Sequence, residues 1–218
     1  MTDYQAARLN MVESQIRPNK VTDPALLEAM LAVPRELFVP SHLRGIAYID
    51  EDIPLGNGRF LMEPMVLGRL LQLAALGPAD AVLEIGCGSG YASALMARLA
   101  HHVVALEEDS RLAAQAADAF RQLGLKNVSL VHGPLADGYP QRAPYQAILF
   151  GGAVATVPPA ISAQLAEGGR LLAVLKKGEG MGKGILMTRT GGGLGHRVIF
   201  DAGTPFLPGF APQPSFVF

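Results

Sequence analysis

The chain has 218 residues, half of them hydrophobic, and a formal net charge of −1 at pH 7. This composition excludes a disordered chain, and the balanced charge offers no electrostatic footprint for nucleic acid or for an anionic membrane surface. The single cysteine, Cys87, excludes an internal disulfide and a cysteine-based zinc site, and it fits a reducing cytoplasm.

The N-terminal third is expected to be mainly helical. Apolar residues recur at helical spacing up to Ile16, and a second short helix follows in "TDPALLEAMLAVP", with Asp23 as its N-cap. Residues 38–64 are rich in Pro and Gly and are predicted to be irregular, and a helix is expected over 63–76. The first residues are too polar for a signal peptide, and no membrane span is expected.

From Ala81 onward, strand and helix patterns alternate, which predicts a mainly parallel sheet with helices on both faces. The later segments "RLLAVL" and "GILMTRT" are joined by the Gly-rich "KKGEGMGKG" with no helix between them, so they must run antiparallel as a hairpin. The expected strands are 81–85, 103–106, 128–132, 145–150 and 170–175, and the expected helices are 91–100, 111–123 and 158–166.

A glycine-rich loop follows the first of these strands and precedes a helix. Gly86, Gly88 and Gly90 would let a ligand approach the backbone closely at a helix N-terminus. The loop lacks the Lys-Ser or Lys-Thr of a phosphate-binding loop, and Tyr91 stands where a dinucleotide fingerprint needs its third glycine. The pattern E-x-G-x-G-x-G, with Glu84 inside the strand end, is typical of S-adenosylmethionine methyltransferases.

The next strand ends in "VVALEED", where Glu107 can accept hydrogen bonds from both hydroxyls of a ribose. An acid at this distance also serves NAD enzymes, so only the glycine loop and Glu107 together favour S-adenosylmethionine, with S-adenosylhomocysteine as the product. Cys87 and Ser89 are interpreted as small fillers of a crowded turn, and no metal site is predicted. The residues expected to bind the cofactor here are Glu84, Gly86, Cys87, Gly88, Ser89, Gly90, Glu107 and Glu108.

Four segments together resemble the protein-L-isoaspartate O-methyltransferases: "VPRELFVP" (33–40), "AYIDEDIPLGNGRFLMEP" (47–64), "VLEIGCGSGYASALMA" (82–97) and "APYQAILFGGAVATVPPAISAQLAEGGRLLAVL" (143–175). "AYIDEDIPLGNG" is the most family-specific of them. The resemblance implies methyl transfer to a carboxylate of isoaspartyl residues in damaged proteins. It also implies a Rossmann-like class I α/β methyltransferase fold with a seven-stranded sheet. On this reading residues 1–218 form one domain, with a helical cap and acceptor loop in 1–76 and a cofactor-binding core in 77–218.

The acceptor loop departs from the family pattern. After Gly-x-Gly the family usually reads Thr-Ile-Ser-Gln-Pro, whereas this chain places Met62 at the serine and Glu63 at the glutamine. Met62 cannot donate a hydrogen bond, and Glu63 would repel an anionic substrate if it faced the site. Arg59 is the one nearby cation that could hold a carboxylate. Arg59 and Met62 are therefore the candidate catalytic positions.

Two further departures concern the sheet. The Gly-Asp-Gly that the family carries after the third strand is Gly133, Pro134 and Leu135 here, which removes an acid expected to contact adenine. These three residues complete the predicted cofactor site, with Asp137 as a possible replacement for the acid. An Asp common in the fourth strand is Gln146.

Alternative functions remain open. Phe60, Leu61 and Met62 suggest a methyltransferase whose acceptor is an apolar small molecule, and a cofactor-binding protein without transfer activity is a third hypothesis. Nucleic-acid methylation ranks lowest, because the fourth strand ends in "FGGA" instead of the Asn/Asp-Pro-Pro-Tyr/Phe of base-amino methyltransferases. No nucleic-acid or membrane partner is expected.

Overall fold

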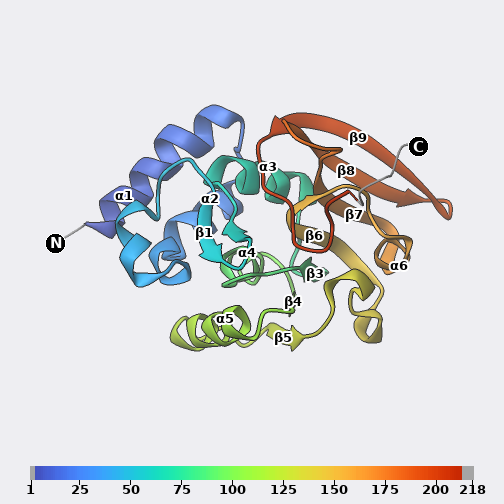
Figure 1. Cartoon of the computed structure of the whole chain (residues 1–218), viewed down its shortest axis with the longest axis horizontal. Helices are drawn as coiled ribbons and strands as arrows, with labels where there is room; N and C mark the ends of the chain where they lie inside the picture. The colour runs from blue at the N-terminus through green and yellow to red at the C-terminus, as the bar shows by residue number, and fades with distance from the viewer. Residues whose placement is uncertain (1–2, 213–218) are drawn as a thin grey trace, which may run out of the picture.

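A seven-stranded sheet forms the centre of the computed structural model, which describes residues 3–212 (Figure 1). Its strand order is β5-β4-β3-β6-β7-β8-β9; the first five are parallel, and β8 and β9 are antiparallel. The mainly parallel sheet and its antiparallel end confirm the prediction. The strands are β3 (Ala81–Ile85), β4 (His102–Glu107), β5 (Val128–His132), β6 (Tyr145–Val154), β7 (Leu165–Leu175), β8 (Gly182–Thr190) and β9 (Gly193–Ala202).

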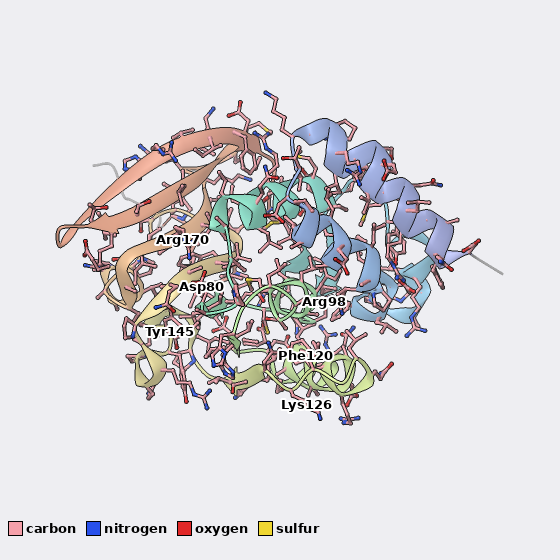
Figure 2. The ribbon with its side chains drawn as sticks, turned by 180° about the vertical axis from the view of Figure 1, so that it is seen from behind. Asp80, Arg98, Phe120, Lys126, Tyr145 and Arg170 are labelled. Atoms are coloured by element: carbon pink, nitrogen blue, oxygen red, sulfur yellow. The ribbon has the colours of Figure 1, made fainter. Side chains whose placement is uncertain are left out.

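The two faces of the sheet bury different cores, because successive residues of a strand point to opposite sides. Val103 and Ala105 of β4 belong to the larger core, whereas Val104 and Leu106 belong to the core on the other face. The larger core is shared with the helices from α1 (Tyr4–Met11) to α5 (Ser110–Gln122), which contributes Phe120 (Figure 2). The second face is covered by the short α6 (Pro159–Ser162) and by irregular chain. Helices thus lie on both faces, as predicted, but in unequal amount.

Most helices are shorter or less regular than the sequence suggests, whereas the one over Ser110–Gln122 has the predicted length. The first passes from α-helix into a π-helix over Val12–Ile16 and a 3-10 turn over Arg17–Asn19. Asp23 caps α2 as predicted, with its carboxylate accepting from the backbone N–H of Leu26 at 3.0 Å. The α-helices are α1 (Tyr4–Met11), α2 (Pro24–Ala32), α3 (Pro64–Ala74), α4 (Tyr91–Met96), α5 (Ser110–Gln122) and α6 (Pro159–Ser162).

The sequence analysis missed two features of the strands. Residues 38–64 are not wholly irregular, because β1 (Ile53–Gly56) and β2 (Arg59–Leu61) form an antiparallel hairpin. Its turn residues Asn57 and Gly58 have φ values of 51° and 70°, the combination that makes Asn-Gly a hairpin signal. The strand β9 also escaped notice, because its first six residues are all exposed and carry no alternation of apolar and polar side chains.

No helix within residues 3–212 is long and apolar enough to cross a membrane. The same part of the chain holds no cluster of three or more His, Cys, Asp or Glu side chains that could bind a metal ion.

Candidate active site

The glycine loop joins β3 to α4 at the carboxyl end of the sheet. On one side β3 pairs with β4, and on the other it pairs with β6, so the strand order reverses at this loop. Ligands of open α/β sheets bind in the crevice outside the strand ends at such a switch point. The backbone N–H groups of Gly86 and Cys87 donate to Leu106 O at 2.9 and 3.0 Å, which fixes the loop against β4.

The three glycines have backbone conformations that other residues rarely adopt. Gly86, Gly88 and Gly90 have φ values of 74°, 58° and 96°. A Cβ atom on Gly90 would lie 2.6 Å from the ring of Phe120 in α5, so a side chain has no space there. The loop therefore presents bare backbone at the start of α4, as close approach by a nucleoside-like cofactor requires.

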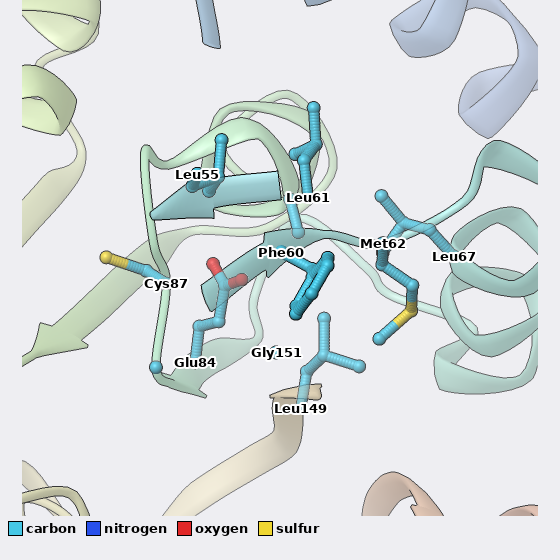
Figure 3. A pocket seen from close by; sticks show the side chains of 11 residues that line it. Leu55, Phe60, Leu61, Met62, Leu67, Glu84, Cys87, Leu149 and Gly151 are labelled. Atoms are coloured by element: carbon cyan, nitrogen blue, oxygen red, sulfur yellow. The ribbon is translucent and has the colours of Figure 1, made fainter. Parts of the chain in front are cut away.

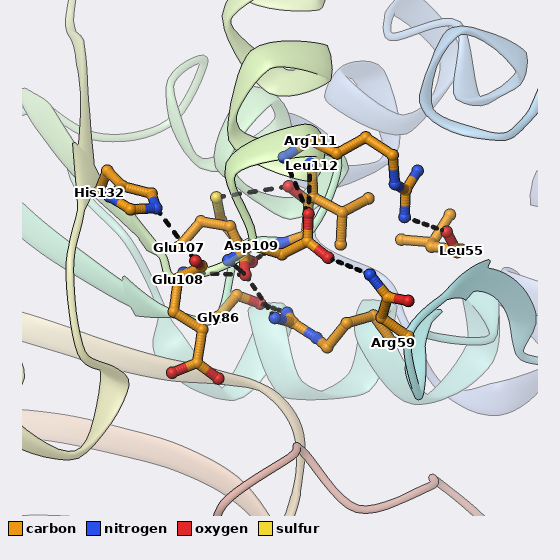
Figure 4. Close-up of polar contacts among 12 residues, drawn as sticks. Leu55, Arg59, Gly86, Glu107, Glu108, Asp109, Arg111, Leu112 and His132 are labelled. Carbon is orange, nitrogen blue, oxygen red and sulfur yellow. Dashed lines mark hydrogen bonds and ion pairs between the residues drawn. The ribbon is translucent and has the colours of Figure 1, made fainter.

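Glu107 lies at the end of β4 and is completely buried. Its Oε1 accepts from Arg59 Nη1 at 2.6 Å and from the backbone N–H groups of Glu108 and Asp109 at 3.0 Å, and its Oε2 accepts from Gly88 N at 2.6 Å (Figure 4). The carboxylate thus links the glycine loop to β2. Its role as the ribose acceptor stays a prediction.

Arg59 is buried, with 3% of its surface exposed, and it is not a free cation. Besides the ion pair with Glu107, its Nη2 donates to Gly86 O at 2.8 Å. The role of Arg59 as the cation that holds an acceptor carboxylate therefore stays a prediction, because its guanidinium is engaged by protein groups here. The sequence gives no signal for this pair, because its two members lie 48 positions apart and carry no joint local pattern.

Glu84 is the second buried carboxyl group of the site, with 2% of its surface exposed. Burial raises the pKa of Glu84 to about 8, and the nearby Glu107 adds to this, whereas a hydrogen bond from the Ser93 hydroxyl opposes the shift. Burial also raises the pKa of the Cys87 thiol well above its ordinary value, so the thiol stays protonated and is a poor nucleophile. Ser89 donates its hydroxyl to Phe38 O at 2.5 Å, in keeping with a packing role.

The acceptor loop closes an apolar cavity of about 20 Å³ beside the glycine loop (Figure 3). This volume has space for one water molecule. Phe60 extends across the cavity toward Leu149 and Gly151 in β6. The lining residues are Leu55, Phe60, Leu61, Met62, Leu67, Glu84, Gly86, Cys87, Ala92, Leu149 and Gly151.

Arg35 fixes the position of the acceptor loop, a role that the sequence analysis did not assign. Its side chain is fully buried; Nη2 donates to Met62 O at 2.8 Å and Nε donates to Ala47 O at 2.7 Å. The guanidinium also lies 4.9 Å from the centre of the Tyr91 ring. The motif "VPRELFVP" therefore supports the loop that carries Met62.

A smaller cavity of about 10 Å³ is shared by β2, the end of β6 and the C-terminal segment. The segment is attached to β6 through Pro205 and Leu207, whose backbone groups bond Ala153 N and O at 2.8 Å each. The sequence analysis did not anticipate this contact. The lining residues are Asp52, Gly58, Arg59, Phe60, Met62, Gly151, Gly152, Thr204, Pro205, Phe206 and Leu207.

Asp52, and not Glu63, is the acid that lines the smaller cavity. Glu63 sits at the start of α3, where its backbone N–H donates to Asp52 Oδ1 at 2.9 Å. Partial burial and the neighbouring acidic residues raise the pKa of Glu63 to about 7. Glu63 is therefore not the acid that faces this cavity.

The remaining positions singled out in the sequence lie after β5 and at the start of β6. The backbone N–H of Gly133 donates to Glu107 O at 3.1 Å and Leu135 is buried, whereas Asp137 is exposed; cofactor binding by Gly133, Pro134 and Leu135 stays a prediction. Gln146 is irrelevant to the site, because it lies at the start of β6, where its side chain accepts from Ala81 N at 2.8 Å, at the opposite end of the sheet.

These observations define the class of protein. The residues present fit a nucleoside-like methyl donor, because a bare glycine backbone and a buried acid at the end of the next strand lie together at the switch point. With the strand order of the sheet, they define a Rossmann-like class I methyltransferase.

The particular family follows from known proteins. The model of the protein-L-isoaspartate(D-aspartate) O-methyltransferase family matches residues 6–190, and the chain belongs to this family. Proteins named protein-L-isoaspartate O-methyltransferase from Synechococcus sp. and Methylorubrum extorquens are 44% and 43% identical over 169 and 170 residues, which is 78% of this chain and 69% and 74% of theirs. S-adenosylmethionine is the methyl donor of the family, as the glycine loop predicts.

Solved structures confirm the fold. A protein-L-isoaspartate O-methyltransferase structure superposes with a TM-score of 0.81 at 24% identity, covering 94% of this chain and 67% of the other. A Plasmodium falciparum protein named for the same activity, in complex with S-adenosyl-L-homocysteine, superposes with a TM-score of 0.78 at 19% identity, covering 94% and 98%.

Proposed function

We propose that this protein transfers the methyl group of S-adenosylmethionine to the carboxylate of isoaspartyl residues in damaged proteins. One observation supports the proposal above all. In a chain of this family, the bare glycine loop and the buried Glu107 meet at the switch point of the sheet.

The chemistry needs few catalytic groups. A carboxylate is ionised at neutral pH and requires no general base. When bound, S-adenosylmethionine supplies a methyl carbon on a sulfonium leaving group, so that a C–O bond replaces a C–S bond. The protein's task is to hold the two reactants in line and to keep water out.

The residues divide that task. The backbone of Gly86–Gly90 and the carboxylate of Glu107 would hold the cofactor, while Phe60, Leu61 and Met62 cover the site with apolar surface and exclude water. Recognition of an anionic acceptor has to come from elsewhere, because Met62 cannot donate a hydrogen bond.

The test uses labelled S-adenosylmethionine and an isoaspartyl peptide, with the same peptide carrying ordinary aspartate as the control. We expect base-labile methyl incorporation into the isoaspartyl peptide alone. Failure to label it, in a protein that binds S-adenosylhomocysteine, rejects the acceptor while leaving the cofactor assignment in place.

A second candidate acceptor is an apolar small molecule with a carboxylic acid or a phenol group. It is favoured by the three consecutive apolar side chains of Phe60, Leu61 and Met62 at the cavity. A panel of aromatic and aliphatic acids, incubated with the labelled cofactor, would reveal it as methyl transfer that exceeds transfer to the isoaspartyl peptide.

The division into residues 1–76 and 77–218 and the cytoplasmic location also stay proposals drawn from the sequence.

A further inference from the structure

Three side-chain contacts connect the β1–β2 hairpin to the end of β4 and to the start of α5, next to the glycine loop. Two of these links reach the N-terminal turn of α5, and the third is a buried ion pair with Glu107 at the end of β4 (Figure 4). The links are Asn57 Nδ2 to Asp109 Oδ2 at 2.8 Å, Arg111 Nη2 to Leu55 O at 2.6 Å and Arg59 Nη1 to Glu107 Oε1 at 2.6 Å.

Glu107 Oε1 has no free acceptor capacity in this arrangement. Each oxygen of a carboxylate offers about two lone-pair sites; Oε1 already accepts from Arg59, Glu108 and Asp109, whereas Oε2 accepts from Gly88 alone. Three of the donors are backbone groups of the glycine loop and of the turn that follows β4. Arg59 is the only side-chain donor among them, so it is the group that can leave without rebuilding the backbone.

The guanidinium also covers the glycine loop itself. A Cβ atom placed on Gly86 would lie 3.0 Å from Arg59 Nη2, so this nitrogen rests against the first glycine. A ligand that uses the loop backbone and Glu107 therefore meets Arg59 at both places.

Thr204 provides an unpaired hydroxyl in the cavity that Arg59 also lines. It is buried, with 3% of its surface exposed, and its hydroxyl is among the few buried side-chain polar atoms of residues 3–212 that have no hydrogen-bond partner. Thr204 and Arg59 line the same small cavity, together with Met62 at the position of the family's serine. An unpaired buried hydroxyl costs stability, which makes a ligand role the simplest account of it.

Asp52 lines that cavity as well, so an anion there needs a cation beside it. The Thr204 hydroxyl alone could not offset the repulsion between two carboxylates. Arg59 is the only cation among the residues that line the cavity.

Resting on the proposed function, we propose that Arg59 exchanges partners during the reaction cycle. It leaves Glu107 when the cofactor's ribose is bound there, and its guanidinium then holds the acceptor carboxylate together with the Thr204 hydroxyl. Arg59 and Thr204 thereby replace the serine that the acceptor loop lacks, and cofactor binding precedes acceptor binding.

The exchange predicts the direction of two effects. A ligand that binds only a minor conformation has its apparent affinity reduced in proportion to the population of that conformation. If the Arg59–Glu107 contact is formed in about 90% of molecules, the cofactor binds about tenfold more weakly than it would without the contact. Loss of Arg59 should therefore tighten cofactor binding while it weakens acceptor binding. A purely structural residue would not move the two affinities in opposite directions.

The first test is calorimetric titration of S-adenosylhomocysteine into wild type, R59Q and R111Q. Gln retains a donor for Glu107 but cannot span Glu107 and Gly86 together, and R111Q loosens the same hairpin without touching Glu107. We expect R59Q to bind about five- to tenfold more tightly and R111Q to change less than twofold. R59K, whose single ammonium also cannot make both contacts, should lie between wild type and R59Q and serves if R59Q is poorly folded.

The second test measures KM for the isoaspartyl peptide in T204V, T204S and T156V. Thr156 follows β6 instead of β9, is exposed and does not line the small cavity, so it controls for the loss of a threonine hydroxyl outside the site. We expect T204V to raise KM about tenfold with unchanged S-adenosylhomocysteine affinity, T204S to restore KM, and T156V to match wild type. R59Q should raise KM at least as much as T204V.

The inference is overturned if R59Q binds S-adenosylhomocysteine no more tightly than R111Q, or if T204V and R59Q leave KM unchanged. If wild type binds S-adenosylhomocysteine but does not methylate the peptide, the proposed acceptor fails and the role of Thr204 fails with it. The S-adenosylhomocysteine affinities of wild type, R59Q and R111Q would still test whether Arg59 leaves Glu107 when the cofactor binds.

Discussion

Replacing Glu84 with glutamine should stabilise the protein above neutral pH. Glu84 is buried behind the glycine loop, and burial raises the pKa of its carboxyl group from 4.5 to about 8. Gln keeps the shape of the neutral acid and carries no charge at any pH. It can still accept the hydrogen bond that Ser93 donates to Glu84.

The sign of the effect follows from proton binding. Between about pH 4.5 and about pH 8 the folded protein holds a proton on Glu84 that the unfolded chain releases, so stability falls as the pH rises. The contribution of Glu84 is complete below about pH 4.5 and lost above about pH 8. The slope is at most about 1.4 kcal/mol per pH unit, so two pH units correspond to about 3 kcal/mol as an upper figure.

Urea unfolding of wild type and E84Q, followed by circular dichroism at several pH values, measures the difference directly. Other titrating groups, such as Glu63, are common to both proteins and cancel. We expect the two free energies of unfolding to diverge by up to about 3 kcal/mol between about pH 5.5 and about pH 7.5, with E84Q the more stable. Parallel pH profiles would refute the assignment of a protonated, buried Glu84.

Three further substitutions test the scaffold of the site. G151A places a Cβ atom 2.0 Å from Gly86 O, so strand β6 and the glycine loop must separate. We expect the free energy of unfolding to fall by about 1–3 kcal/mol and S-adenosylhomocysteine to bind several-fold more weakly in calorimetry. R35K leaves a buried carbonyl of the acceptor loop or of Ala47 unpaired and should cost about 2 kcal/mol in urea unfolding. D109A removes the N-cap of α5 and should lower stability by about 1 kcal/mol, measured the same way at neutral pH.

Each substitution has a matched control. G45A adds a methyl group where no atom lies within 4 Å, and D118A removes an exposed acid from the middle of α5. R121K exchanges an arginine whose side chain is 73% exposed. A control that destabilises as much as its partner, or a scaffold variant with wild-type stability, would contradict the corresponding contact.

Local patterns predicted much of the fold. Alternating strand and helix periods located the five parallel strands, and the Gly-rich joint between "RLLAVL" and "GILMTRT" predicted the antiparallel pairing of β7 with β8. The sequence contains a signal for the β1–β2 hairpin, because Asn57-Gly58 favours a hairpin turn. It contains no clear signal for β9, because the first six residues of this edge strand are all exposed.

The sequence by itself determined the class of cofactor and the loop that binds it, because a glycine-rich turn between a strand and a helix is a local property of consecutive residues. Only the tertiary structure decided how the site is arranged. It paired Arg59 with Glu107, brought Thr204 beside the acceptor loop and assigned Arg35 to hold Met62. These contacts join residues that are distant along the chain, and their energies depend on burial and geometry, for which no short stretch of sequence carries a pattern.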